Sequence, residues 1–254
     1  MNADGTFTAY PDAADDNGDG TVTFFYQLSG GDTAQVTLTF EAEEFLWFVD
    51  STPGTTVCSG TNEGTQACPA ATLASVTAAD TVNDVIFIDS GTYAGVANTL
   101  ENTELVIGNG STSTLSALVA SRVTPVAGSS FAPYDALNGA APVFTCTNVT
   151  CLTLGTGGTL RGFSISDSGA TGTDLAGTNF GTLTVDEVSL SGTGRALNLA
   201  TGTILGTGFT SVTSTSSGTQ GINLAGIIGT LNLGSNRSEA RRPRASWWAR
   251  RPVP

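Results

Sequence analysis

Residues 151–234 repeat one short pattern, in which an apolar triplet or quartet is followed by a Gly, Thr or Asn turn and another apolar stretch. The first apolar stretch of each repeat is CLTL at 151–154, DLAG at 174–177, ALNL at 196–199 and GINL at 221–224. Equivalent positions recur after 23, 22 and 25 residues, at Leu152, Leu175, Leu197 and Ile222. A period in the twenties is typical of a solenoid, because a unit of that size buries its apolar face only by stacking on its neighbours.

The repeats read as β-strands. Segments such as TLRGFSI at 159–165 and TLTVDEVSL at 182–190 are short, β-branched and rich in Thr, which favours strands over the helix pairs of other solenoids. We therefore predict a parallel β-helix in outline, with the four equivalent Leu and Ile positions facing inward.

The charge balance limits the partners of this chain. Its 254 residues carry 22 Asp or Glu against nine Arg, with no Lys or His, for a formal net charge of −13. Residues 1–236 alone hold 21 acidic side chains and three Arg, a net −18 that repels nucleic acid and anionic lipid. No run of 18 apolar residues is present, so we predict no membrane span, and residues 1–20 do not read as a signal peptide. The acidic, Lys-free composition favours an extracellular or cell-surface bacterial protein, of which this chain would be a piece.

The four cysteines fall in two close pairs. The spacings of Cys58 with Cys68 and of Cys146 with Cys151 predict two small-loop disulfides in an extracellular-looking chain. Free buried thiols and a zinc site are the alternatives. The Cys-x9-Cys and Cys-x4-Cys spacings differ from the Cys-x2-Cys of common zinc sites, and the chain has no His to complete one.

Residues 3–40 alternate apolar and polar positions and predict three strands, GTFTAYP, TVTFFYQLS and AQVTLTF. The segment from DGTFTAYP to AQVTLTF resembles the last strands of the Ig-like or cadherin-like repeats of large bacterial surface proteins. Those repeats begin on Asp-Gly-Thr-Phe-Thr-Tyr and finish on Thr-Val-Thr. The resemblance implies that residues 1–42 are the C-terminal strands of a truncated Ig-like β module.

A second resemblance covers about residues 44–234. The segments FLWFVDS, VIFIDSGTY, ELVIGNG, TLRGFSI and GTGRALNL are similar to the pectin-lyase-like, right-handed β-helix regions of adhesin-type bacterial surface proteins. This implies an all-β chain in which a right-handed parallel β-helix over 43–236 follows the partial Ig-like module. PAATLASVTAAD at 69–80 is the best helix candidate, and a helix there would cover the open end of the first coil.

The last eighteen residues, from Arg237, do not fit the repeat. They hold six of the nine Arg and two of the three Trp, and they carry a net charge of +5. We predict that residues 237–254 are a disordered, non-native-looking tail produced by a frame shift or read-through. The alternatives are a basic arm for an acidic partner, or a cap in which Trp247 and Trp248 cover the last coil.

DDNGDG at 15–20 matches the opening of a calcium loop. Asp15, Asn17 and Asp19 would present alternate oxygen ligands, and the Gly that follows permits the turn. The twelfth position is Tyr26 rather than the bidentate Glu of an EF-hand, and a polar β-turn explains the same residues. Calcium is the one cofactor that the sequence suggests.

Carboxylates of the repeat region are candidates for a sugar-binding groove, because paired carboxylates serve glycoside hydrolysis. They are Asp167, Asp174, Asp186 and Glu187. Pectate lyases on the fold that the chain resembles use Asp-held calcium with an Arg base, which makes Arg161 and Arg195 the matching candidates. The hydrolase motifs of that family are absent, and without His no Ser-His-Asp triad forms. Solvated surface carboxylates are the simpler interpretation.

Three asparagines lie inside rungs of the repeat, and we expect them to form an internal amide ladder. They are Asn198, Asn223 and Asn232.

The sequence favours a structural or adhesive segment of a secreted or cell-surface repeat protein, monomeric and without catalysis, with a host surface or a polysaccharide as ligand. The alternative is a carbohydrate-active β-helix, a lyase or a hydrolase. A small-ligand or calcium-binding module rests on DDNGDG alone. Three or more carboxylates that converge with an Arg in one groove would favour the enzyme.

Overall fold

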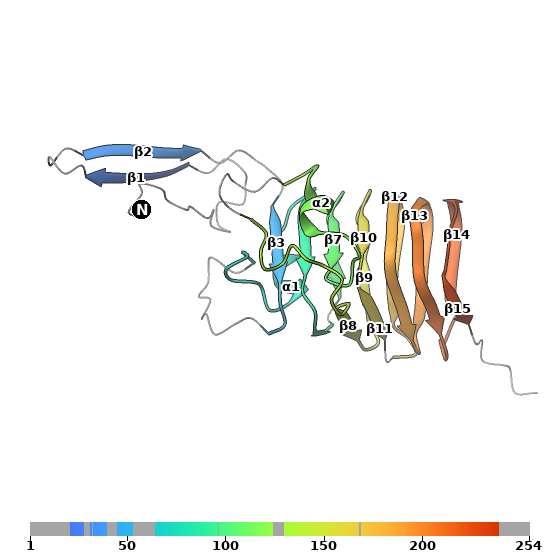
Figure 1. The fold of residues 1–254 in the computed structure, drawn as a ribbon. Coiled ribbons are helices and arrows are strands. Elements are labelled where there is room, and N and C mark those ends of the chain that lie inside the picture. Colours follow the sequence, from blue (N-terminus) through green and yellow to red (C-terminus); the bar gives the residue numbers. More distant parts are fainter. Residues whose placement is uncertain are drawn as a thin grey trace, which may run out of the picture.

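The computed structural model describes residues 21–27, 31, 33–39, 45–52, 64–95, 97–123, 130–167 and 169–238. These residues are mostly β (Figure 1). The elements are β1 Thr21–Gln27, β2 Thr33–Thr39, β3 Leu46–Val49, α1 Leu73–Val76, β4 Val85–Ile88, β5 Thr92–Ala94, β6 Asn98–Thr99, β7 Leu105–Gly108, α2 Leu115–Val119, β8 Val143–Cys146, β9 Thr150–Thr153, β10 Thr159–Arg161, β11 Ser164–Asp167, β12 Thr173–Gly192, β13 Arg195–Ser214, β14 Ile222–Gly229 and β15 Ser235–Ser238.

The first two strands form a sheet of their own. β1 and β2 pair antiparallel, from Thr21 opposite Thr39 to Gln27 opposite Thr33. Two of the three strands expected in the N-terminal segment are therefore present. The third, GTFTAYP, lies outside the described residues.

The remaining thirteen strands form one sheet in which every strand pairing is parallel. Its main path of eight strands runs β3-β4-β7-β10-β12-β11-β8-β5. Strands β12 and β13 are 20 residues long and pair with each other along most of their length. The beginning of β12 also pairs with β9, its middle with β10 and its end with β11. The three short strands therefore follow one another along one edge of β12, and Figure 1 shows the strands from β3 to β14 stacked in chain order.

The equivalent apolar residues of the repeat pair with one another in adjacent strands, and we call this row of residues the leucine column. Leu152 pairs with Leu175, Leu175 with Leu197, and Leu197 with Ile222. The three leucines are buried, with exposed fractions of 2%, 0% and 0%. This confirms the inward prediction for the leucines. Ile222 is only half-buried, because in the described residues β14 pairs with β13 alone.

Strands β3, β4 and β7 are buried on both faces, which explains their continuous apolar sequences. Trp47, Ile86 and Val106 point into the cluster that holds the leucine column. Their neighbours along each strand, such as Phe48 and Phe87, point the other way into a second cluster. That second cluster is completed by Leu115 and Val119 of α2 and by Phe131.

The helix expected over 69–80 is a single turn. Thr72 caps α1 by accepting a hydrogen bond from the Ser75 backbone N, and the helix ends after Val76. Leu73 and Val76 are buried in the cluster that also holds Trp47 and Val49 of β3. Both described helices, at four and five residues, are far too short to cross a membrane.

The amide ladder exists, but its position differs from the expectation. Asn223 Nδ2 donates to Asn198 Oδ1 at 2.8 Å, and the two residues share a register position. Both side chains are half-buried and alternate with the inward leucines, so they lie on the outer face rather than inside. Asn232 instead donates to the Thr207 carbonyl oxygen at 3.0 Å and does not join the ladder.

A disulfide joins Cys146 and Cys151, as predicted, with 5.8 Å between their Cα atoms. It closes the corner between β8 and β9. The second predicted pair, Cys58 with Cys68, is not described because Cys58 lies outside the described residues.

Strand pairing continues past the expected boundary at 237. β15 pairs with the end of β13 as far as Ser238, so Arg237 and Ser238 still belong to the sheet. Residues 239–254 lie outside the described residues.

Candidate functional site

Arg161, Asp186 and Glu187 lie together where two neighbouring strands end their pairing. Arg161 of β10 is in register with Asp186 of β12. The Arg161 Nε atom lies 3.0 Å from Glu187 Oε2, and Nη1 lies 3.6 Å from Asp186 Oδ2. The structure thus brings together three of the six predicted groove residues, as an ion-paired cluster that is partly open to solvent.

A bulge in β12 directs Glu187 into this cluster. The register between β12 and β13 shifts between Asp186 and Val188, and Glu187 itself has a φ of 58° in the left-handed region. Such a bulge re-aims a side chain without ending the strand. Glu187 consequently reaches the segment before α2, where it accepts a hydrogen bond from the Ser111 hydroxyl at 3.0 Å and others from the Thr112 backbone N and hydroxyl.

The electrostatics of the cluster favour a structural role. Burial alone would raise the pKa of Glu187, but the hydrogen bonds from Thr112 and Ser111 and the charge of Arg161 outweigh burial and lower that pKa. Glu187 is therefore ionised at neutral pH and does not hold the proton that a general acid needs. Asp186 accepts hydrogen bonds from the backbone N and the hydroxyl of Thr207, each at 2.6 Å. The cluster fastens the segment around Thr112 to the sheet.

Asp167 and Asp174 form a separate, internal pair. Each side chain is 1% exposed, which places them beyond the reach of a polymeric substrate. Asp167 is the last residue of β11 and Asp174 is the second residue of β12, so both lie at the corner between these strands. Burial, together with the charge of Asp167, raises the pKa of Asp174 to about 9.

Arg195 lies in neither group. Its Nη2 donates to the Thr219 hydroxyl at 2.6 Å, and its Nε donates to the Gln220 carbonyl oxygen at 3.1 Å. It holds the segment that leads into β14. The six candidates therefore occupy three places, and only two carboxylates meet an Arg.

A third group of carboxylates was not found by sequence reasoning. Asp84 and Glu104 are completely buried, and each stands directly before an apolar strand, β4 or β7. Asp84 accepts hydrogen bonds from the Trp47 indole and the Phe45 backbone N, both at 2.8 Å. Burial raises the pKa of Asp80 and of Glu104, and the two carboxyl groups lie close enough to affect each other. The sequence feature that could have indicated this group is the acidic residue that stands directly before both VIFI and LVIG.

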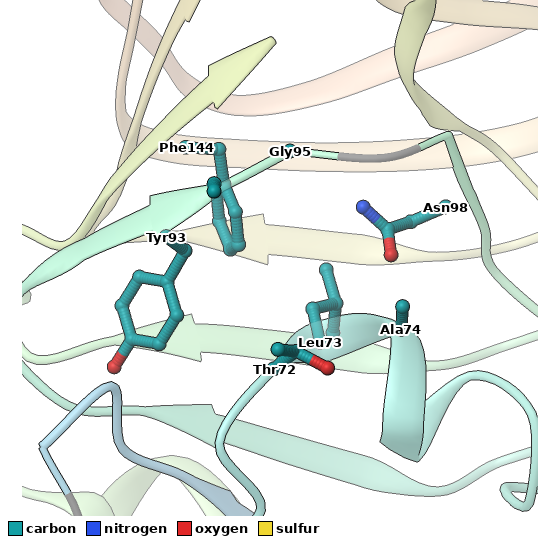
Figure 2. Close-up of a pocket in the computed structure, with 8 residues that line it drawn as sticks. Thr72, Leu73, Ala74, Tyr93, Gly95, Asn98 and Phe144 are labelled. Carbon is teal, nitrogen blue, oxygen red and sulfur yellow. The ribbon is translucent and has the colours of Figure 1, made fainter.

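A small apolar pocket of roughly 210 Å³ lies between the start of α1 and the strands opposite it. Figure 2 shows Leu73 facing Tyr93, Asn98 and Phe144 across this pocket. None of the described residues that line it carries a charge. The pocket thus offers shape and a few polar atoms but no acid, base or cation.

The predicted calcium residues Asp15, Asn17 and Asp19 lie outside the described residues. In the part of the chain that the structure describes, no three His, Cys, Asp or Glu side chains are placed together for a metal ion.

Comparison of the chain with protein-family models, with curated proteins and with solved structures finds no match.

Proposed function

We propose that this chain is a structural or adhesive segment of a bacterial cell-surface or secreted repeat protein, in which a right-handed parallel β-helix follows the end of an Ig-like module. The observation that carries the proposal is the shared register of β12 and β13 with the buried leucine column. Strands that stack in register at a nearly constant period build a rigid, elongated scaffold. Such a scaffold provides length and an extended surface rather than a cleft.

The positions of the charged groups support a role without catalysis. Glu187 is ionised and fully hydrogen-bonded beside Arg161, and the Asp167–Asp174 pair is closed to solvent. A glycosidase needs two accessible carboxyl groups about 5–9.5 Å apart with different proton affinities. Neither group of the described residues meets that requirement.

Export is supported by the disulfide and the surface charge. A disulfide between Cys146 and Cys151 persists in oxidising compartments, where bacterial surface proteins reside. The net charge of −13 keeps such a scaffold soluble and favours neutral or cationic surfaces as contacts.

One experiment tests this function against the enzyme alternative. The full chain is incubated with a panel of acidic and neutral polysaccharides, and both retained protein and released sugar ends are measured. We expect retention on a subset or none, with no sugar ends above those in buffer. Product formation that R161Q abolishes, at an unchanged melting temperature, would establish the lyase or hydrolase instead. R195Q is the matched control, because Arg195 bonds only a neighbouring segment.

A further inference from the structure

The Asp167–Asp174 pair stands where the disulfide stands one strand earlier. Asp167 of β11 is in register with Cys146 of β8. Thr173 and Leu175 are in register with Thr150 and Leu152, so Asp174 lies opposite Cys151. Two carboxylates therefore face the same corner of the sheet that a covalent cross-link closes in the preceding layer.

These carboxylates carry oxygens without partners. Asp167 Oδ2 and Asp174 Oδ1 are buried and accept no hydrogen bond, and Asp167 Oδ1 accepts only the Gly169 backbone N at 2.7 Å. Among the described residues no cation neutralises them, because the adjacent Arg195 turns toward Thr219 and Gln220. An unneutralised buried carboxylate strongly destabilises the folded state, so the corner requires either protons or a cation.

Backbone oxygens converge on the same space. A Cβ atom added to Gly194 would lie 1.9 Å from Asp167 Oδ2 and 2.7 Å from each of the Gly169 and Gly172 carbonyl oxygens. One added to Gly172 would lie 2.1 Å from Asp167 Oδ2. Glycine at both positions thus lets the backbone pack directly against the Asp167 carboxylate, close to the carbonyl oxygens of Gly169 and Gly172. Each of these carbonyl oxygens accepts one backbone hydrogen bond, from Gly172 N at 3.1 Å and from Arg195 N at 2.9 Å, and keeps a second lone pair for another ligand. The neighbouring Thr193 hydroxyl is also buried without a hydrogen bond.

We propose that this corner binds one calcium ion, held by the carboxylates of Asp167 and Asp174 and the carbonyl oxygens of Gly169 and Gly172. Calcium takes six to eight oxygen ligands at about 2.3–2.6 Å and accepts carboxylates and backbone carbonyls in irregular geometry. Magnesium demands a near-ideal octahedron and keeps its waters, and zinc prefers nitrogen and sulfur. The ion cross-links this corner as the disulfide cross-links the corner before it.

A shared proton is the competing state. Two buried carboxylates at one corner disfavour a second negative charge, so without a cation the pair holds one proton between them. Calcium then displaces that proton. Among the described residues, the other charged group beside the corner is Arg195, which is in register with Thr173 and whose guanidinium bonds Thr219 and Gln220. β8 and β9 supply the disulfide, and β12 supplies Gly192 opposite Asp167.

The test uses the full chain with its disulfide intact, stripped with EDTA and titrated with calcium chloride while the melting temperature is followed. We expect a saturable rise of several degrees, and a smaller or no rise with magnesium chloride at equal ionic strength. D174N should abolish the calcium response and yet fold, because the amide is a neutral isostere. D167N provides a second variant if D174N is poorly expressed.

Two controls separate this corner from other acidic sites. D186N removes a carboxylate of the Arg161 cluster, and the double variant D15N/D19N removes the ligands of the DDNGDG motif. Both should keep the calcium response. A response that survives in D174N, or that D15N/D19N abolishes, would overturn the proposal. An unmodified chain that ignores calcium at about pH 8 would also overturn it, and would assign the corner to a shared proton.

Discussion

Leu175 of β12 and Leu197 of β13 pair at one register position, and neither exposes any of its surface. The same column continues to Leu152 on one side and to Ile222 on the other. Each leucine therefore packs against the leucine one repeat away as well as against its own layer. Cooperation between layers follows, because loss of one leucine weakens both neighbours.

Leu197→Asp should prevent stable folding of the parallel sheet. Removal of a buried Leu side chain costs about 2–5 kcal/mol, and an unpaired buried carboxylate adds to that loss. Leu205→Asp is the matched control on the same strand, because Leu205 is 50% exposed, and it should change stability by no more than about 0.5 kcal/mol. Circular dichroism melting of both variants measures the difference. Equal stability of the two would contradict the inward placement of the column.

Replacement of Cys146 and Cys151 together by Ser should lower the free energy of unfolding by roughly 2 kcal/mol, the loop-closure value for so short a loop. The sheet should persist, because the core around Leu152 and Leu175 does not depend on the bond. Urea unfolding of the oxidised, reduced and double-variant proteins makes the comparison. Reduced and double-variant proteins should agree with each other, and unchanged stability in both would mean that the bond is strained.

Stability should fall as the pH rises from mildly acidic to alkaline values. Burial raises the pKa of Asp174 to about 9 from a usual value of 3.8, and it also raises the pKa of Asp80 and Glu104. A raised carboxyl pKa means that the folded state holds a proton that the unfolded chain releases. The stabilisation is complete below the unfolded pKa and is lost as the pH climbs through the folded one.

The measurement is the urea midpoint in EDTA between about pH 5 and pH 9, where each such group contributes a slope of up to about 1.4 kcal/mol per pH unit. D174N should flatten this slope without reversing it. Glu187, with its lowered pKa, acts oppositely, and its contribution is lost as the pH falls through its folded pKa. Stability that rises steadily toward alkaline pH would show that the buried carboxyl groups are ionised when folded.

Arg161→Gln should make the segment that leads into α2 more flexible, while it lowers the free energy of unfolding only slightly. Arg161 and Glu187 side chains are each 24% exposed, so their pair is worth about 1 kcal/mol or less. Its contacts with Ser111 nevertheless fasten that segment, and amide hydrogen exchange of residues 111–119 should accelerate. Arg195→Gln is the control and should accelerate exchange around Thr219 instead. Faster exchange at both places in either variant would indicate general destabilisation.

The strands whose residues recur at a regular spacing could be predicted from the sequence. The corners between strands could not. The spacing of Leu152, Leu175 and Leu197 predicts that they stack on one another, since repeats of nearly equal length place equivalent residues side by side in parallel strands. Asp174 sits next to Leu175 and both are buried, so the alternation that sorts inner from outer residues fails where the chain turns. Sequence reasoning therefore placed Asp167 and Asp174 in an open groove, whereas the corner encloses them.

The Arg161 cluster illustrates the same limit. The sequence could predict that Arg161 lies near Asp186, because the two residues are one repeat apart on the neighbouring strands β10 and β12. The attachment of Glu187 to Ser111 and Thr112 does not, because it crosses about 75 residues and depends on a bulge with a positive φ. Nothing in the local sequence distinguishes that bulge from regular strand.

The central claim is that successive repeats stack in register, and engineered cross-links test it most directly. Thr178 is in register with Ala200, and Ala176 is in register with Asn198. In a background without Cys146 and Cys151, T178C/A200C should form a disulfide rapidly, because adjacent strands place the two Cα atoms about 4.8 Å apart. A176C/A200C shares one cysteine but is offset by two residues, which separates the Cα atoms by about 8 Å and should prevent the bond. Quantitative thiol labelling after mild oxidation gives the result. Cross-linking of the first pair alone is predicted, and equal cross-linking of both pairs, or of neither, would contradict the stacked register.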